Sequence, residues 1–314
     1  MSLAQPAQGS VLTGIGLKVL SVAIFVAMQA LIKAAGDLPV GQIIFFRAFF
    51  AMLPILVFLA YRREIATALS TSRPLAHVSR GLIGVASMGL GFFALSRLPL
   101  PEVITLNYAQ PLLLVVFSAL FMGETIRIYR WSAVAVGMIG VFIVSWPKLT
   151  LFTSQSELSN HEAMGIIAML TAAAMSASAL LMVRNLVQTE RSATIVMWFS
   201  LTASVAGLLS LPLGWSPLTA AQAGLLIGSG ICGGVAQIVM TEAYRHAEAS
   251  TVAPFEYMSL LIGVAVGYFA FQEVPTIHML VGGLIVIAAG IFIIWRERQL
   301  GIERAAVRKV TPPQ

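Results

Sequence analysis

Two stretches of 25 residues decide the fold of this chain: LPEVITLNYAQPLLLVVFSALFMGE at 100–124 and ASTVAPFEYMSLLIGVAVGYFAFQE at 249–273. Each is apolar, is long enough to cross a bilayer as a helix, and carries polar residues in its first half. The second lies 149 residues after the first, and this shift aligns three predicted helices of each half without gaps. Identical pairs include Ala94/Ala243, Val103/Val252, Tyr108/Tyr257, Leu112/Leu261, Glu124/Glu273 and Trp146/Trp295. The sequence therefore predicts two related halves.

Composition places the rest of the chain in a membrane as well. Of the 314 residues, 58% are hydrophobic and 10% are charged, and the mean hydropathy is +0.90. Soluble domains carry about 25% charged residues, so a chain this poor in charge must turn most of its surface to lipid. We therefore expect an all-α integral membrane protein with ten transmembrane helices. They lie near 12–33, 40–60, 78–97, 102–122, 131–147, 164–184, 193–212, 220–244, 251–271 and 278–296.

Ten helices in two halves give five helices to each half. Because five is odd, the second copy must enter the bilayer from the side opposite to the first, which makes an inverted repeat. We expect the first five-helix repeat at 1–150, the inverted second repeat at 160–298 and a basic cytoplasmic tail at 299–314. Inverted repeats are common among transporters, whose sites lie near mid-membrane between the halves. The repeat therefore favours a carrier that works by alternating access.

Basic residues predict the orientation of the helices. If the N-terminus is cytoplasmic, the cytoplasmic connections and the C-terminal tail hold 14 Lys and Arg residues, whereas the outer connections hold 3. Positive residues concentrate in cytoplasmic loops, so we expect both termini in the cytoplasm and the chain in the inner (plasma) membrane. Residues 1–14 contain no basic residue ahead of the first apolar run, which argues against a cleaved signal peptide. Lys18 and Arg47 fall inside predicted helices.

Polar residues recur at matching positions of the fourth and ninth predicted helices. The shift pairs Asn107 with Glu256, and three residues further on it pairs Gln110 with Ser259. Residues three apart share one face of a helix. A charge at the centre of a bilayer costs about 2.5–3.5 kcal/mol, so its presence needs a reason. We expect six residues to face a central cavity: Asn107, Tyr108, Gln110, Glu256, Tyr257 and Ser259.

These polar residues have two alternative roles. In the first, Glu256 meets the ammonium group of an amino acid or carries a coupling proton, while Asn107 and Gln110 hydrogen-bond a carboxylate or a side chain. In the second, the same groups form hydrogen bonds between helices that hold the bundle together. An ionisable residue inside a membrane is by default a candidate for function, which is why the first role is the hypothesis for Glu256.

Further candidates lie on other predicted helices. Arg47, in the motif FFRAFF, is a counter-charge for a substrate carboxylate, a gate partner, or a side chain that snorkels toward the membrane surface. Gln29 on the first helix and Trp198 on the seventh are expected to line the same cavity or to pack between helices. Pro111 and Pro254 are expected to bend their helices, because a proline frees a backbone carbonyl that a neighbour or a cavity must satisfy.

Several classes of protein are excluded by what the sequence lacks. It contains no H-E-x-x-H and no Walker motif, and G-x-G-x-x-A at 89–94 lies inside an apolar helix with no strand before it. Cys232 is the only cysteine and the four histidines are scattered, so we expect no catalytic residue, no metal site and no cofactor. An enzyme is therefore not expected. A channel would show rings of charge or a carbonyl filter, and neither occurs.

Longer motifs carry a resemblance to a known family. The run FALSRLPLPEVITLNYAQPLLLVVFSALFMGE followed by WSAVAVGMIGVFIV resembles the EamA-type repeat of the drug/metabolite transporter superfamily. The run TEAYRHAEASTVAPFEYMSLLIGVAVGYFAFQE followed by GGLIVIAAGIFII resembles it again, so the resemblance covers about 12–296. Within the family the chain looks most like the YddG-type amino-acid exporters. One departure is that Pro111 has Leu260 as its repeat partner, while Pro254 lies earlier in its helix.

The resemblance implies a secondary transporter with a substrate cavity between its halves. Its expected substrate is a small metabolite, an amino acid first, including aromatic or other bulky apolar ones, and the expected direction is out of the cell. Import of another metabolite such as riboflavin or S-adenosylmethionine is the alternative, and an intramembrane enzyme is a more distant one. The expected partners are this substrate and the lipid bilayer, with proton coupling left open, no nucleic acid, and a monomeric or weakly dimeric chain.

Overall fold

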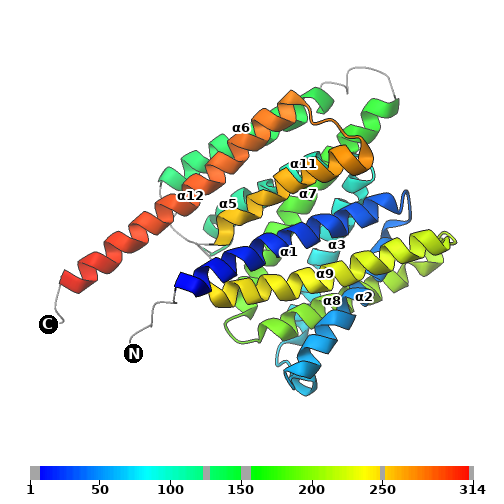
Figure 1. Ribbon diagram of the computed structural model, residues 1–314, viewed down its shortest axis with the longest axis horizontal. Coiled ribbons are helices and arrows are strands. Elements are labelled where there is room, and N and C mark those ends of the chain that lie inside the picture. The colour runs from blue at the N-terminus through cyan, green and yellow to red at the C-terminus, as the bar shows by residue number, and fades with distance from the viewer. Residues whose placement is uncertain (1–7, 123–127, 150–156, 248–251, 311–314) are drawn as a thin grey trace.

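A computed structural model describes residues 8–122, 128–149, 157–247 and 252–310, and these residues form helices and short connections (Figure 1). Within these described residues, ten helical segments are long and apolar enough to cross a membrane, and the stretches that qualify are 19 to 27 residues long. In chain order these segments are α1 (Gln8–Ala34), α2 (Val40–Tyr61), α3 (Pro74–Leu95), α4 with α5 (Leu100–Asn107 and Ala109–Met122), α6 (Ile128–Leu149), α7 (Glu157–Leu186), α8 (Ser192–Leu209), α9 (Ala220–His246), η4 with α11 (Ala253–Tyr257 and Met258–Phe271) and α12 (Ile277–Val310). Two short 3-10 helices, η1 (Ile65–Thr67) and η3 (Leu211–Leu213), lie in the connections after α2 and α8.

The expected ten-helix fold is confirmed; most helix ends differ by a few residues, while α7 begins seven residues before its expected start and α12 continues 14 residues beyond its expected end. The third span begins at Pro74, four residues before the expected start. Proline at the first position of a helix is favourable because its fixed φ suits the helix and the missing N–H has no partner there. The polar turn that follows Pro74 is therefore helical although its hydropathy is low. The first turn of α1 and the last turns of α12 lie on the same side of the molecule, as an even number of spans requires (Figure 1).

The two halves interleave around a pseudo-twofold axis. The first helix of each half packs against the third helix of the other half, since α1 lies against α9 and α3 lies against α7. The second helices, α2 and α8, pack on each other, and so do the fifth helices, α6 and α12. Figure 1 shows the pairs α1–α9 and α6–α12 running side by side. Because the halves have five spans each, the second half is inverted relative to the first.

The axis relates individual hydrogen bonds as well. Gln42 Nε2 donates to the carbonyl oxygen of Ser216 at 3.0 Å, and the N–H of Ser216 donates back to Gln42 Oε1 at 3.2 Å. Arg191 Nη1 donates to Thr67 Oγ1 at 2.9 Å. The 149-residue shift carries Gln42 onto Arg191 and Thr67 onto Ser216. One of these contacts therefore lies at each end of the α2–α8 pair. At one end the residue near the helix start comes from the first half, and at the other end it comes from the second half.

The fourth and ninth spans break at matching residues. α4 ends at Asn107 and Tyr108 separates it from α5, while η4 ends at Tyr257, the repeat partner of Tyr108. Pro111 has no N–H to donate to the carbonyl of Asn107, which explains the first break. Pro254 lies in the first turn of η4, where a proline is tolerated. The segments before the two breaks differ, because one is an α-helix and the other is a 3-10 helix.

Candidate functional site

Two tyrosines join the halves where the fourth and ninth spans break. The rings of Tyr108 and Tyr257 meet edge to face with centroids 5.0 Å apart. Tyr108 Oη lies 2.6 Å from Ser259 Oγ, and the Ser259 hydroxyl donates to the carbonyl oxygen of Glu256 at 2.7 Å. The sequence predicted that these residues face a central cavity; the structure brings Tyr108 into contact with Tyr257 and Ser259. This arrangement contains the hydrogen bonds between helices that the second of the two sequence hypotheses requires.

Asn107 lies at the exposed edge of this centre. All seven residues of α4 before it are buried, and so are Tyr108 and Ala109 after it, yet Asn107 is exposed. Gln110 is partly exposed and Pro111 is exposed, and the three residues share one helical face. Neighbouring helices α7 and α11 cover the rest of α4. Asn107 therefore marks the face of this span that neighbouring helices leave uncovered.

Glu256 forms an ion pair that sequence reasoning missed. Its Oε2 atom is paired with Nζ of Lys18, which comes from α1 in the other half of the chain. The Lys18 side chain is 2% exposed and the Glu256 side chain is 52% exposed, so the lysine is the inner member of the pair. Lys18 Nζ also lies 5.5 Å from the centroid of the Tyr244 ring of α9. A lysine within an apolar run is a signal that could have suggested a carboxylate partner.

A second ion pair ties the far end of α1 to the end of the ninth span. Lys33 Nζ lies 2.5 Å from Glu273 Oε1 and donates to the carbonyl oxygen of Leu98 at 2.7 Å. Glu273 Oε2 accepts a hydrogen bond from the N–H of Leu100 at 2.9 Å. The charges of this pair are thus also bonded to the backbone around the start of α4, which is typical of a structural contact.

Arg47 and Gln29 hold buried polar atoms without partners. Among the residues that the structure describes, no group hydrogen-bonds Arg47 Nε or Gln29 Oε1, and both atoms are buried. A Cβ atom built on Gly233 of α9 would lie 3.0 Å from Met28 Sδ and 3.6 Å from Arg47 Nε, so this glycine keeps room where α1 and α2 side chains meet. The first of these atoms is a hydrogen-bond donor and the second is an acceptor.

Arg47 and Gln29 lie at similar depths in the bundle. Arg47 is seven residues after Val40, the first residue of α2, and Gln29 is five residues before Ala34, the last residue of α1. At 1.5 Å per residue these spacings correspond to about 10 Å and about 8 Å from the same side of the bundle.

Trp198 contacts the loops at one end of the bundle. Its indole Nε1 donates to the carbonyl oxygen of Leu69 at 3.2 Å, and its ring stacks on His77 with centroids 5.7 Å apart. The sequence predicted that Trp198 lines the cavity or packs between helices, and these contacts join it to the α2–α3 connection. This position gives Trp198 a role in joining α8 to that connection.

Glu190 fixes the same connection to the α7–α8 turn. Thr71 Oγ1 donates to Glu190 Oε1 at 2.7 Å, and His77 Nε2 lies 3.8 Å from Glu190 Oε2. The hydrogen bond from Thr71, followed by the nearby imidazole of His77, holds the pKa of the Glu190 carboxyl below its usual range. Arg73 Nη1 donates to Asn185 Oδ1 at 3.0 Å. The α2–α3 connection and the α7–α8 turn therefore lie on the same side of the bundle, as the inverted topology requires.

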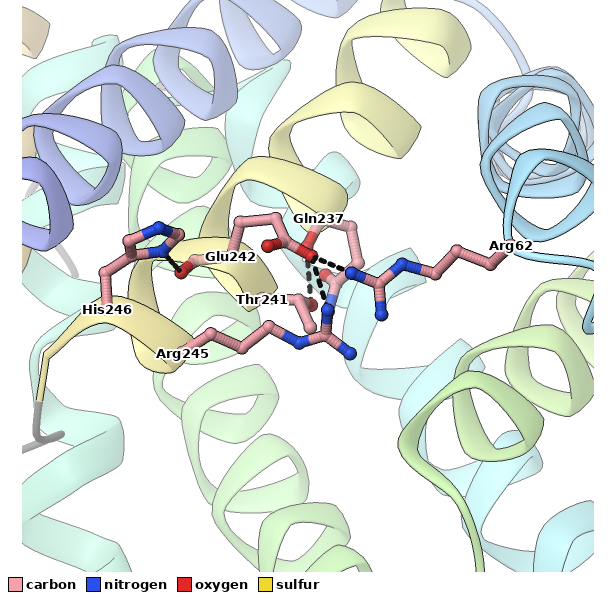
Figure 2. Close-up of polar contacts among 6 residues, drawn as sticks. All are labelled: Arg62, Gln237, Thr241, Glu242, Arg245 and His246. Carbon is pink, nitrogen blue, oxygen red and sulfur yellow. Dashed lines mark hydrogen bonds and ion pairs between the residues drawn. The ribbon is translucent and has the colours of Figure 1, made fainter. Parts of the chain in front are cut away.

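A polar cluster at the end of α9 lies on this side too. Figure 2 shows the carboxylate of Glu242 between the guanidinium groups of Arg62 and Arg245, at 3.3 Å and 3.1 Å. His246 Nδ1 lies 2.8 Å from the carbonyl oxygen of Glu242. Arg62 follows the last residue of α2, so the cluster fastens the end of α2 to the end of α9.

Comparison with known proteins decides the family. The model of the EamA-like transporter family matches residues 12–146 and 163–296, which is one copy in each half. The chain belongs to the EamA-like transporter family. Relatives of this EamA-like protein match over most of their length. It is 30% identical to the pseudopaline exporter CntI of Pseudomonas aeruginosa over 88% of this chain and 94% of that protein.

Two other relatives differ in what they carry. The S-adenosylmethionine uptake transporter of Rickettsia felis is 28% identical over 92% of this chain and 94% of its own. The riboflavin transporter of Rhizobium johnstonii is 29% identical over 91% and 90%. A solved crystal structure superposes with a TM-score of 0.63 at 16% identity, covering 93% of this chain and 98% of that one, which shows the fold alone.

Family membership settles the broad function. This EamA-like protein is a multi-pass membrane protein and a secondary transporter of small metabolites, and it is not an enzyme. The expected family is therefore confirmed. The relatives carry pseudopaline, S-adenosylmethionine or riboflavin, so they do not single out the YddG-type amino-acid exporters that the sequence resembled.

Proposed function

We propose that this EamA-like transporter exports zwitterionic amino acids, bulky apolar ones among them, by alternating access between its two inverted halves. The observation that carries the proposal is the pair of orphan atoms, Arg47 Nε and Gln29 Oε1. A buried polar group that lacks a partner costs about 1–3 kcal/mol, and more when it is charged. A carboxylate on Arg47 and an ammonium on Gln29 would satisfy both atoms at once.

The surroundings of these atoms suit a substrate with an apolar side chain. Met28 Sδ lies beside Arg47 at Gly233, and methionine adapts its shape to different apolar groups. Phe46 and Phe50 stack on the same helix as Arg47, with ring centroids 5.8 Å apart. An amino acid whose charged end meets Arg47 and Gln29 would thus find apolar neighbours for its side chain.

The charge bias supports the orientation that we propose, and the most similar relatives named above support the direction. The excess of Lys and Arg on the side of the α2–α3 and α7–α8 connections supports a cytoplasmic position for that side and for both termini, in the inner membrane. Arg47 and Gln29 would then lie in the outer half of the bilayer. The relatives at 30% identity are named as exporters, which supports export, while those at 28% are named as uptake transporters.

Transport in proteoliposomes tests the proposal. Purified protein is reconstituted, and counterflow of labelled L-phenylalanine is measured with and without a pH gradient. Competition is measured with 3-phenylpropionate, which lacks the amine, and phenethylamine, which lacks the carboxylate. Loss of one charge-assisted hydrogen bond is worth about 1.5–3 kcal/mol, so each analogue should compete at least about tenfold more weakly than phenylalanine. Acceleration by the pH gradient would add proton coupling to the proposal.

Variants at Arg47 connect the measurement to the site. Arg47→Gln should raise the KM for L-phenylalanine at least about tenfold, because the carboxylate loses its charged donor. Arg63→Gln, in the exposed connection after α2, is the matched control and should leave the KM unchanged. Saturable transport of riboflavin with no transport of any amino acid, or a KM that is insensitive to Arg47→Gln, would refute the proposal. Transport of S-adenosylmethionine together with sensitivity to Arg47→Gln would keep the site and change the substrate.

A further inference from the structure

Lys18 is a buried cation within the first membrane-spanning helix, α1. It lies seven residues into the first span, which begins at Val11, so it is about 10 Å from that end of α1. Its side chain is 2% exposed. A buried ammonium is retained only when a counter-charge compensates for the lost hydration. Its compensating group is Glu256, 238 residues away in the chain.

The two members of the pair differ in exposure. Glu256, at 52% exposure, is the member that an incoming molecule reaches first, and Lys18 lies behind it. Two uncharged groups are among the described neighbours of the pair: the Tyr244 ring lies 5.5 Å from Lys18 Nζ, and the Ser259 hydroxyl donates to the Glu256 carbonyl oxygen. An ammonium has three donors, and Glu256 is the hydrogen-bond acceptor that the described residues offer to Lys18. Donors of Lys18 are therefore left for a second acceptor.

An ion pair of this kind discriminates between ligands by their charge. A ligand with a single positive charge that took Glu256 would leave Lys18 buried without a counter-charge, and a single negative charge on Lys18 would do the same to Glu256. A zwitterion brings one charge of each sign and leaves neither member unpaired. We infer that Lys18 and Glu256 form a loading site for zwitterions, in which the ammonium of the substrate takes Glu256 and its carboxylate takes Lys18. This inference rests on the proposed function.

The loading site belongs to one face of the membrane. The 149-residue shift carries Glu256 onto Asn107 and Lys18 onto Ile167, which is exposed, so the other half has no equivalent charged pair. Lys18 lies near the end of α1 that packs against the end of α9, since a Cβ on Gly14 would lie 2.7 Å from Ala247 Cβ. This is the end where the chain begins, which the charge bias assigns to the cytoplasm. A loading site at the cytoplasmic end suits export, because a substrate that binds there would next move outward to Arg47.

Sidedness gives the sharpest experiment. The double variant Lys18→Met with Glu256→Gln removes both charges together, so neither is left unpaired. Initial rates of L-phenylalanine counterflow are measured in right-side-out and everted vesicles. In everted vesicles, where the N-terminal face is outside, the half-saturating concentration should rise about tenfold or more, equivalent to about 1.4 kcal/mol. In right-side-out vesicles the half-saturating concentration should change by no more than about twofold, which is far less than a tenfold step. The reason is that substrate at that face binds at Arg47 and Gln29, which the double variant leaves unchanged.

Matched controls separate recognition from stability. Lys33→Met with Glu273→Gln removes the other ion pair of the same two spans and should not change the half-saturating concentration at the N-terminal face. The charge swap Lys18→Glu with Glu256→Lys keeps an ion pair and should keep the preference for L-phenylalanine over phenethylamine and 3-phenylpropionate. An unchanged value, or an equal rise at both faces, in the double neutral variant would overturn the loading site. Absence of amino-acid transport in the wild type would instead refute the proposed function.

Discussion

Tyr108 and Tyr257 are 149 residues apart in the chain and occupy equivalent positions in the two halves, and their rings meet with centroids 5.0 Å apart. Each stands where its span changes from one helical segment to the next. Residues near a twofold axis meet their own repeat partners, so this contact shows where the axis passes between the fourth and ninth spans. The hydroxyl of Tyr108 adds a hydrogen bond to Ser259 across the same boundary.

The hydrogen bond between Tyr108 and Ser259 should couple the two residues in stability. In a double-mutant cycle of Tyr108→Phe and Ser259→Ala we expect a coupling free energy of about 0.6–1 kcal/mol, the usual size for hydrogen bonds between membrane helices. The free energy of unfolding in mixed micelles is the measurement. Tyr268→Phe, on the same span but 49% exposed, is the control and should show no coupling to Ser259→Ala. Additive effects of the two substitutions would contradict the contact.

Close packing of α6 on α12 should depend on glycine at 282. A Cβ atom there would lie 2.5 Å from the carbonyl oxygen of Gly140, which is backbone and cannot move aside without shifting a helix. Gly282→Ala should therefore destabilise the protein by about 1–3 kcal/mol, the range for overpacking. Gly224→Ala, where nothing lies within 4 Å of the added atom, should be neutral or stabilising. Equal thermal stability of the two variants in detergent would argue against this packing.

Glu190 should make stability depend on pH. Because the folded state lowers the pKa of this carboxyl, the ionised form stabilises the fold, fully so above the ordinary carboxyl pKa of about 4.3. This contribution is lost as the pH falls through the lowered pKa of the folded state. The melting temperature of the wild type should therefore exceed that of Glu190→Gln at neutral pH, and the two should converge in acid. Glu64→Gln, in the neighbouring connection, is the control; a difference that grows in acid would have the wrong sign.

Single cysteines should report the orientation of the bundle. In a variant without Cys232, cysteine is placed at Asp37 in the α1–α2 connection or at Ser72 in the α2–α3 connection, both of which are exposed. Because the α2–α3 side carries the excess of basic residues, a membrane-impermeant maleimide should label Asp37→Cys in intact cells and Ser72→Cys only after the membrane is opened. The reverse pattern would invert the proposed orientation and place the Lys18–Glu256 pair on the outer face.

Sequence alone determined the number of helices, the duplication and the family. In lipid every backbone N–H and C=O must bond within its own segment, so each long apolar run is a spanning helix whatever its neighbours are. The same runs carry the 149-residue repeat, and an odd number of spans per half fixes its inversion. Polar positions at Asn107, Glu256 and Arg47 could also be identified, because a polar group in such a run is rare whichever way it faces.

Only the tertiary structure decided which of these groups meet. Hydropathy says that α1 crosses the membrane but not how it is rotated, and that rotation brings Lys18 to Glu256 while leaving Gln29 Oε1 and Arg47 Nε without partners. The rotation of α8 likewise places Trp198 against the loop at Leu69. Rotation and pairing depend on side chains hundreds of residues apart packing together, and no pattern local to a single span encodes that.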